Sequence, residues 1–157
     1  MSKIKLIISD IDGIITNGTK LYTVDGVLGK FFFERDFSAQ KQFKARGIDF
    51  VFMTSDSMNV DLLRVKSKHI IVHHVHRDEK LDGLKFLMKQ YGVEPNETAY
   101  IGDDIEDMAP LEYLKDNGGC AFVPADGHPL LLAKFQIIPR KGGEGVIESL
   151  YEELFGE

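Results

Sequence analysis

Short apolar runs alternating with helical patterns are the feature that most constrains the fold of this chain. Apolar residues recur at helical spacing between the runs. Strands that are buried on both faces and separated by helices form a parallel sheet with helices on both sides. The sequence therefore predicts an α/β fold whose strands are KLIIS, IDFVFMT, HIIVHH, TAYIG, CAFV and FQII.

Two further features complete the expected fold. The stretch KLYTVDGVLGKFFF predicts a β-hairpin that turns at Asp25-Gly26. Asp78 is expected to cap a helix. Other helices are predicted over residues 37–46, 57–66 and 127–133, in IEDMAPLEYL and along a stripe that begins at Val146.

The 157 residues suit a single domain covering 1–157. The net charge of −6 argues against a nucleic-acid partner and against an anionic membrane surface. An anionic small substrate stays possible, because a metal ion or a lysine can reverse the local field. With no export signal and no apolar stretch long enough to span a bilayer, a cytoplasmic location is the default expectation.

Two groups of carboxylates follow predicted strands. Asp10 and Asp12 come directly after the first, and Asp103, Asp104 and Asp107 come after TAYIG. Ligands of open parallel sheets bind at the carboxyl ends of the strands, so the two groups can meet there. Clustered carboxylates repel one another, and a hard cation such as Mg²⁺ relieves the repulsion. The alternative is that these residues are loop aspartates and helix caps, a role that suits Asp104.

Thr54 and Lys80 extend this candidate site toward phosphate chemistry. Thr54 ends the second strand of the predicted sheet, and Lys80 stands near a helix start, where an ammonium is unfavourable. A solvated surface charge is the other interpretation of Lys80. Metal, hydroxyl and lysine together predict a phosphoryl-transfer site in which Asp10 is the nucleophile and forms an aspartyl-phosphate.

These residues carry a resemblance to a known family. DIDGIITNG, MTS, Lys80 and GDDIED resemble the four motifs of the haloacid dehalogenase (HAD) phosphatase superfamily. The hairpin, RDF at 35–37, AYIGDD, PADGHPLL and RKGGEGV resemble its capless 3-deoxy-D-manno-octulosonate 8-phosphate (KDO-8-phosphate) phosphatases and the related nonulosonate 9-phosphate phosphatases. The resemblance implies a Rossmann-like fold with no cap domain and an Mg²⁺-dependent enzyme that hydrolyses a sugar phosphate.

The resemblance also implies roles. Asp10 would be the nucleophile and a metal ligand, and Asp103 would be the second carboxylate ligand. Asp12 would act as acid and then base, while its main-chain carbonyl binds Mg²⁺. Asp104 and Asp107 would hold the metal's waters or position the lysine.

Thr54 and Lys80 would bind the transferring phosphoryl group. The second motif departs from the family pattern of Thr or Ser, Gly, then Arg or Glu, because Ser and Asp follow Thr54 here. This change leaves the identity of the sugar open. Substrate contacts are expected from Ser55, Asp56, Arg35, Arg140 and Lys141.

A site with no cap domain needs another cover. The resemblance implies a homotetramer with hairpins at the contacts, in which residues 140–145 reach the next active site. Arg140 or Lys141 would then bind the substrate's carboxylate. The alternative is that Gly142 and Gly143 form a plain turn.

Two other functions compete with a phosphatase. A signalling receiver domain also combines aspartates, a hydroxyl, a lysine and Mg²⁺, but its phosphorylated aspartate lies on a middle strand and its threonine and lysine come late. Here the expected nucleophile, Asp10, follows the first strand. A catalytically silent binding or assembly relative is the second competitor. The altered second motif favours it, but every core carboxylate and Lys80 are present, which argues against it.

Overall fold

Six parallel strands form the central sheet of the computed structural model, which describes residues 3–66 and 69–156. β1 pairs with β4 on one side and with β6 on the other. The chain runs outward from β1 in both directions, so the strand order reverses between β1 and β6, where a crevice forms in such sheets. In spatial order the strands are β5 (Ile71–His74), β4 (Asp49–Thr54), β1 (Leu6–Ser9), β6 (Thr98–Ile101), β7 (Cys120–Pro124) and β8 (Gln136–Ile138).

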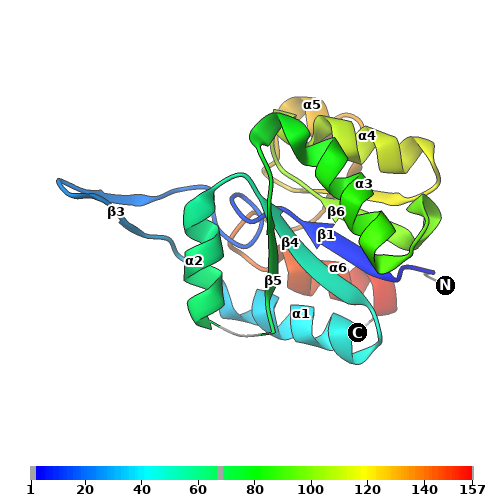
Figure 1. The fold of residues 1–157 in the computed structure, drawn as a ribbon, viewed down its shortest axis with the longest axis horizontal. Coiled ribbons are helices and arrows are strands. Elements are labelled where there is room, and N and C mark those ends of the chain that lie inside the picture. The colour runs from blue at the N-terminus through cyan, green and yellow to red at the C-terminus, as the bar shows by residue number, and fades with distance from the viewer. Residues whose placement is uncertain (1–2, 67–68, 157) are drawn as a thin grey trace.

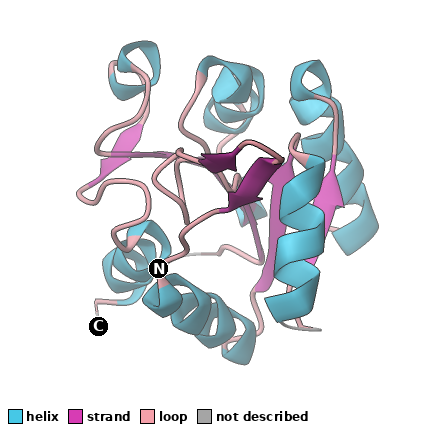
Figure 2. Ribbon diagram, turned by 90° about the vertical axis from the view of Figure 1, so that its left-hand side faces the viewer, coloured by secondary structure: helices cyan, strands magenta, loops and turns pink. Residues whose placement is uncertain are grey.

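Helices cover both faces of this sheet (Figures 1 and 2). The alternation of β1 separates two cores, because Ile7 points into one while Leu6 and Ile8 point into the other. All three side chains are fully buried, which stabilises the fold by roughly 1.5–3 kcal/mol each. One face carries α1 (Glu34–Ala45), α2 (Ser57–Lys66) and α6 (Val146–Phe155), and the other carries α3 (Lys80–Tyr91), α4 (Met108–Asp116) and α5 (Pro129–Leu132). The predicted α/β class is confirmed.

Some predicted helix boundaries were wrong. α1 begins at Glu34 rather than at 37, because its N-cap is Phe33, which makes no side-chain capping bond and leaves no signal in the sequence. Asp78 does not cap α3. It lies inside a 3₁₀ turn, Arg77–Glu79, that leads directly into the helix.

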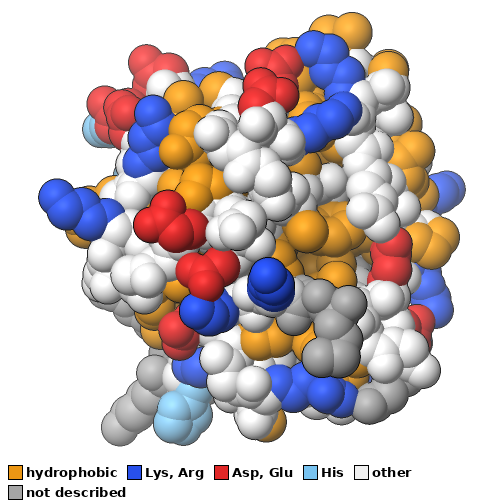
Figure 3. Space-filling model, turned by 90° about the vertical axis from the view of Figure 1, so that its right-hand side faces the viewer, with side chains coloured by type: hydrophobic (Ala, Val, Ile, Leu, Met, Phe, Trp, Pro, Cys, Tyr) orange, Lys and Arg blue, Asp and Glu red, His pale blue; other side chains and the backbone are white. Residues whose placement is uncertain are grey.

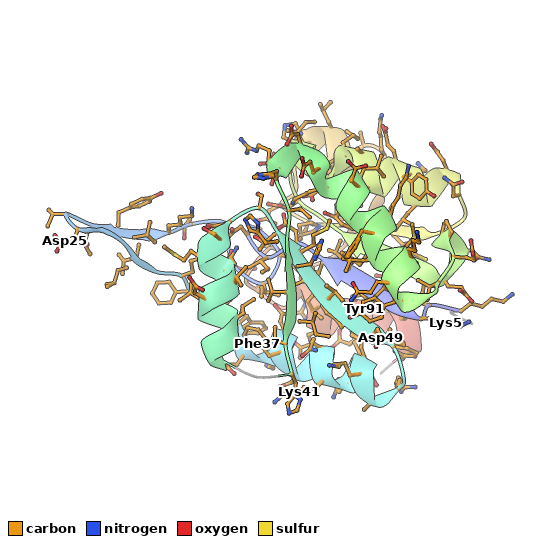
Figure 4. All side chains as sticks on the ribbon, viewed as in Figure 1. Lys5, Asp25, Phe37, Lys41, Asp49 and Tyr91 are labelled. Atoms are coloured by element: carbon orange, nitrogen blue, oxygen red, sulfur yellow. The ribbon has the colours of Figure 1, made fainter. Side chains whose placement is uncertain are left out.

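The predicted hairpin is present as β2 (Leu21–Thr23) and β3 (Gly26–Gly29), which form their own antiparallel sheet. It projects from the body of the molecule, with Asp25 at its tip (Figures 1 and 4). Between β1 and β4 the chain holds only this hairpin and α1, so no cap domain is inserted there. Several large apolar side chains of the hairpin and the residues beside it are exposed: Leu21, Tyr22, Val24, Leu28 and Phe31.

The side of the molecule opposite the hairpin carries basic and acidic side chains interspersed with apolar ones (Figure 3). Neither positive nor negative charge dominates that side. In the part of the chain that the structure describes, none of the helices has both the length and the apolar character needed to cross a bilayer.

Candidate active site

Three neighbouring strand ends open into one cavity of about 140 Å³. β1 contributes the two aspartates of the first motif, β4 contributes Thr54 and Ser55, and β6 contributes the next acidic pair. The structure therefore brings together residues that lie far apart in the sequence, as the strand ends predicted. The lining consists of Asp10, Asp12, Gly18, Thr54, Ser55, Asp103, Asp104 and Glu106.

Asp10, Asp103 and Asp107 form an acidic cluster. Carboxylate oxygens of Asp10, Asp103 and Asp107 lie within 4.8 Å of one another. Burial, together with repulsion from Asp107, raises the pKa of Asp10 well above its usual range. Burial and the same repulsion raise the pKa of Asp103 to about 7. A divalent cation would offset this repulsion, so the donor set fits a hard metal ion.

Asp107 organises the cluster, because four donors converge on it. Its Oδ1 accepts from Lys80 Nζ at 2.8 Å and from the Tyr100 hydroxyl at 2.6 Å. Its Oδ2 accepts from the backbone N–H groups of Asp103 and Asp104, at 3.0 and 3.2 Å. With its oxygens engaged in this way, Asp107 positions the lysine, which leaves Asp10 and Asp103 as the carboxylates open to a metal ion.

Lys80 is the first residue of α3 and its side chain is 1% exposed, so it is not a solvated surface charge. Its Nζ lies 3.1 Å from Asp10 Oδ2. Burial alone would lower the pKa of Lys80, but attraction to Asp10 and Asp107 outweighs it and raises the pKa. The side chain is therefore a charged ammonium beside the expected nucleophile.

Gly13 allows Asp103 to approach the loop after β1. Its φ is +82°, and a Cβ at this position would lie 1.7 Å from Asp103 Oδ2. No side chain fits there without moving the carboxylate. The glycine of the first motif is thus required by the geometry of the site.

Asp104 and Glu106 flank this cluster. Asp104 caps the 3₁₀ turn Ile105–Asp107 by accepting from Ile105 N at 2.7 Å, as the capping alternative predicted. Glu106, which was not predicted from the sequence, has Oε1 3.4 Å from Lys80 Nζ and Oε2 2.7 Å from Arg77 Nε. The acidic density of GDDIED was an available signal for it.

Two residues around Asp12 were not predicted from the sequence. Lys30 Nζ lies 2.8 and 2.9 Å from the two carboxylate oxygens of Asp12, 2.8 Å from Asp56 Oδ2 and 2.7 Å from Asn59 Oδ1. Asn59 Nδ2 donates to Asp12 Oδ2 and to Thr54 Oγ1, both at 2.9 Å. These contacts join the hairpin, α2 and two strand ends into one network.

A sequence signal existed for Asn59 but not for Lys30. Asn59 lies four residues before Leu63 on the buried side of α2, and a polar residue on an apolar stripe marks a candidate site. Lys30 follows a hairpin strand and precedes three phenylalanines, where no periodic pattern singles it out.

Four of the expected substrate contacts, Asp56, Arg35, Arg140 and Lys141, lie outside the cavity lining. Asp56 Oδ2 instead lies 3.0 Å from Lys20 Nζ and 2.8 Å from Lys30 Nζ. Arg35 Nε pairs with Glu148 Oε2 at 3.1 Å, and its side chain is 64% exposed. Arg140 and Lys141 are exposed. They precede Gly142, where a Cβ would lie 2.1 Å from the carbonyl oxygen of Gly13. The segment 140–145 therefore packs against the loop after β1 in its own chain, through a glycine turn.

No protein-family model matches the chain. Individual relatives do. A KDO-8-phosphate phosphatase from Yersinia pestis is 28% identical over 152 residues, which are 95% of this chain and 78% of the relative. The structure of a KDO-8-phosphate phosphatase from Moraxella catarrhalis, in complex with a magnesium ion, a phosphate ion and KDO, is 30% identical. It aligns with a TM-score of 0.82 over 99% of this chain and 87% of its own.

A third similar structure, from Legionella pneumophila, is named as a hydrolase of HAD subfamily III A. It is 26% identical and aligns with a TM-score of 0.81 over 99% of this chain and 84% of its own. These relatives match 95% or more of the chain, and the cavity at its strand ends holds clustered carboxylates that fit a hard metal ion. The chain therefore belongs to the haloacid dehalogenase superfamily and is a phosphatase of that type, resembling the KDO-8-phosphate phosphatases.

Proposed function

We propose that the protein hydrolyses the phosphomonoester of a 3-deoxy-2-ulosonic acid, with KDO-8-phosphate as the first candidate. The supporting observation is the convergence of Asp10, Thr54 and Asp103 on one cavity, with Lys80 3.1 Å from the first of them. A nonulosonate 9-phosphate is the second candidate. The altered second motif leaves the choice between these two sugars open.

Mg²⁺ is the proposed cofactor. The carboxylates of Asp10 and Asp103 and the main-chain carbonyl of Asp12 would hold it, and the raised pKa values of the two carboxyl groups support this choice. Bound there, the ion would supply positive charge that keeps Asp10 ionised and offsets the charge of the phosphoryl group.

The proposed reaction has two steps. Asp10 attacks phosphorus in line and forms an aspartyl-phosphate, while Asp12 protonates the departing alkoxide. Asp12 then takes a proton from water, whose oxygen attacks the phosphoryl group, releasing inorganic phosphate and restoring Asp10. The Thr54 hydroxyl and the Lys80 ammonium hold the phosphoryl oxygens during both steps. Asp104 and Asp107 support the metal's waters and the lysine.

We also propose that the enzyme is a homotetramer whose hairpins meet at the subunit contacts. The exposed apolar side chains of the hairpin support this assembly, since such a patch is usual at an interface. Arg140 and Lys141 would bind the substrate's carboxylate across a subunit boundary. Light scattering tests the mass, and kinetics of Arg140→Ala with Lys141→Ala on the sugar substrate test the shared site. A monomer, or unchanged kinetics, would refute the proposed assembly.

A phosphate-release screen with Mg²⁺ tests the reaction itself. KDO-8-phosphate, a nonulosonate 9-phosphate and p-nitrophenyl phosphate are compared, with Asp10→Asn as the matched inactive variant. Asparagine keeps the shape of Asp10 but is neither a carboxylate nucleophile nor an anionic ligand, so we expect turnover to vanish while the fold survives. A folded Asp10→Asn variant that kept substantial activity would overturn the mechanism. A wild-type enzyme that hydrolysed only the aryl ester would overturn the proposed substrate.

A further inference from the structure

Lys30 is a buried cation that the proposed reaction does not yet use. Its side chain is 0% exposed, although it follows a hairpin that projects into solvent. An ammonium loses several kcal/mol of hydration on burial unless its donors are paired. Its donors are taken up by Asp12, Asp56 and Asn59, at 2.7 to 2.9 Å.

Asp56 anchors this lysine. Lys20, just before β2, and Lys30, just after β3, both reach Asp56 Oδ2, at 3.0 and 2.8 Å. The other oxygen, Oδ1, accepts from Met58 N at 3.0 Å, at the start of α2. Burial raises the pKa of Asp56, but the two lysines outweigh it and lower the pKa to about 2. The carboxylate that departs from the family's second motif thus clamps both ends of the hairpin to α2.

Asp12 depends on this clamp for its orientation. Lys30 contacts both of its oxygens, Asn59 donates to one at 2.9 Å, and Thr16 Oγ1 lies 3.4 Å away. The Asp12 side chain is 30% exposed, so burial alone does not restrain it. Without the lysine, the carboxyl group would be held chiefly by the Asn59 amide.

We propose that Lys30 is a positioning residue, which holds Asp12 where it meets the leaving oxygen, with Asp56 and Asn59 fixing the lysine. This inference rests on the proposed function, because it assigns Lys30 to the acid step of that reaction. Its consequence depends on the leaving group. An alkoxide needs a proton as it departs, whereas p-nitrophenolate is stable enough to leave without one. Misplacing Asp12 should therefore lower kcat/KM for the sugar phosphate more than kcat/KM for the aryl phosphate.

The test compares kcat/KM for KDO-8-phosphate, phenyl phosphate and p-nitrophenyl phosphate, since this ratio reports the steps up to departure of the leaving group. General acid catalysis contributes roughly 10²–10⁴-fold, so Lys30→Met should lose about 100-fold or more on KDO-8-phosphate. The loss should shrink through phenyl phosphate to about tenfold or less on p-nitrophenyl phosphate. Lys30→Arg keeps the charge, so it should lose less kcat/KM on KDO-8-phosphate than Lys30→Met does. Its losses on the three substrates should therefore differ less.

Lys20→Met is the matched control, because it removes the ion pair between Lys20 and Asp56 and leaves the contacts of Asp12 in place. It should change kcat/KM for all three substrates by the same factor. If Lys30→Met does not fold, it is replaced by the double variant Lys30→Met with Asp56→Asn. The second change removes a carboxylate that would otherwise lack its cation. Circular dichroism and thermal melting establish the folded state of each variant.

Equal losses on all three substrates in a folded Lys30 variant would overturn the inference, since a purely structural role predicts them. If the wild-type enzyme hydrolyses only the two aryl esters, the proposed sugar substrate is ruled out. The comparison of phenyl phosphate with p-nitrophenyl phosphate still tests the role of Lys30. A wild-type enzyme that hydrolyses none of the three overturns both proposals.

Discussion

Asp36→Asn should remove a defined part of the pH dependence of stability. Asp36 is fully buried in α1, and its Oδ1 accepts from the backbone N–H groups of Ile147 and Glu148 at the start of α6. Among the residues that the structure describes, none forms a hydrogen bond with its Oδ2. Burial raises its pKa from 3.8 to about 6, against the opposing effect of the two N–H groups.

The sign of the effect follows from proton binding. The folded state holds the Asp36 proton more tightly than the unfolded chain does. Stability from this group is therefore highest below the unfolded pKa of 3.8 and falls as the pH rises through about 6. The full shift corresponds to about 3 kcal/mol, and about 2 kcal/mol of it is lost between about pH 4.5 and about pH 7.5.

The assay is urea unfolding of wild type and Asp36→Asn at those two pH values. Asparagine does not titrate, so the wild type should lose about 2 kcal/mol more than the variant on going to the higher pH. For a chain of this length the same difference is roughly 4–8 °C in Tm. Asp25→Asn, at the hairpin tip, changes the same formal charge and should follow the wild type (Figure 4). Parallel pH dependence in wild type and Asp36→Asn would refute the reasoning.

Three further predictions concern the active site. Gly13→Ala should be inactive and less stable, because its Cβ would lie 1.7 Å from Asp103 Oδ2 at a φ of +82°; kinetics and melting check this, and normal turnover would contradict it. Asp107→Asn should reduce kcat by roughly 10²-fold, since the amide cannot accept all four donors and Lys80 shifts; a smaller change than tenfold in steady-state kinetics would argue against the organising role. Chelation should abolish phosphate release and added Mg²⁺ should restore it, whereas activity that survives exhaustive chelation would exclude the metal site.

The sheet and the carboxylate cluster could be predicted because their signals are local. The apolar run that ends at Asp10 predicts both a buried strand and the edge of the sheet at which the carboxylate lies. Lys80 was predicted for a similar reason, since an ammonium is unfavourable at a helix start unless carboxylates surround it. Both inferences needed only the order of residues along the chain.

Lys30 and the segment 140–145 show where such inference ends. The position of Lys30 depends on how the hairpin lies against α2, which is set by a clamp on Asp56 that no periodic pattern encodes. Within its own chain, the glycines of the segment pack on the loop after β1, a contact of backbone with backbone that the sequence did not indicate, while its reach to another subunit stays a prediction. Tertiary contacts of this kind leave no trace in composition or spacing.

The central place of β1 has a consequence for how the enzyme forms. β1 comes first among the strands, yet its second partner, β6, follows only after α3. Pairing strands so distant closes a large loop, which is slow compared with helix formation. Until that pairing is complete, Asp10 has no Asp103 beside it and the proposed metal ligands are not assembled. During refolding, the return of activity therefore reports the completed central pairing and lags behind the return of the helical signal.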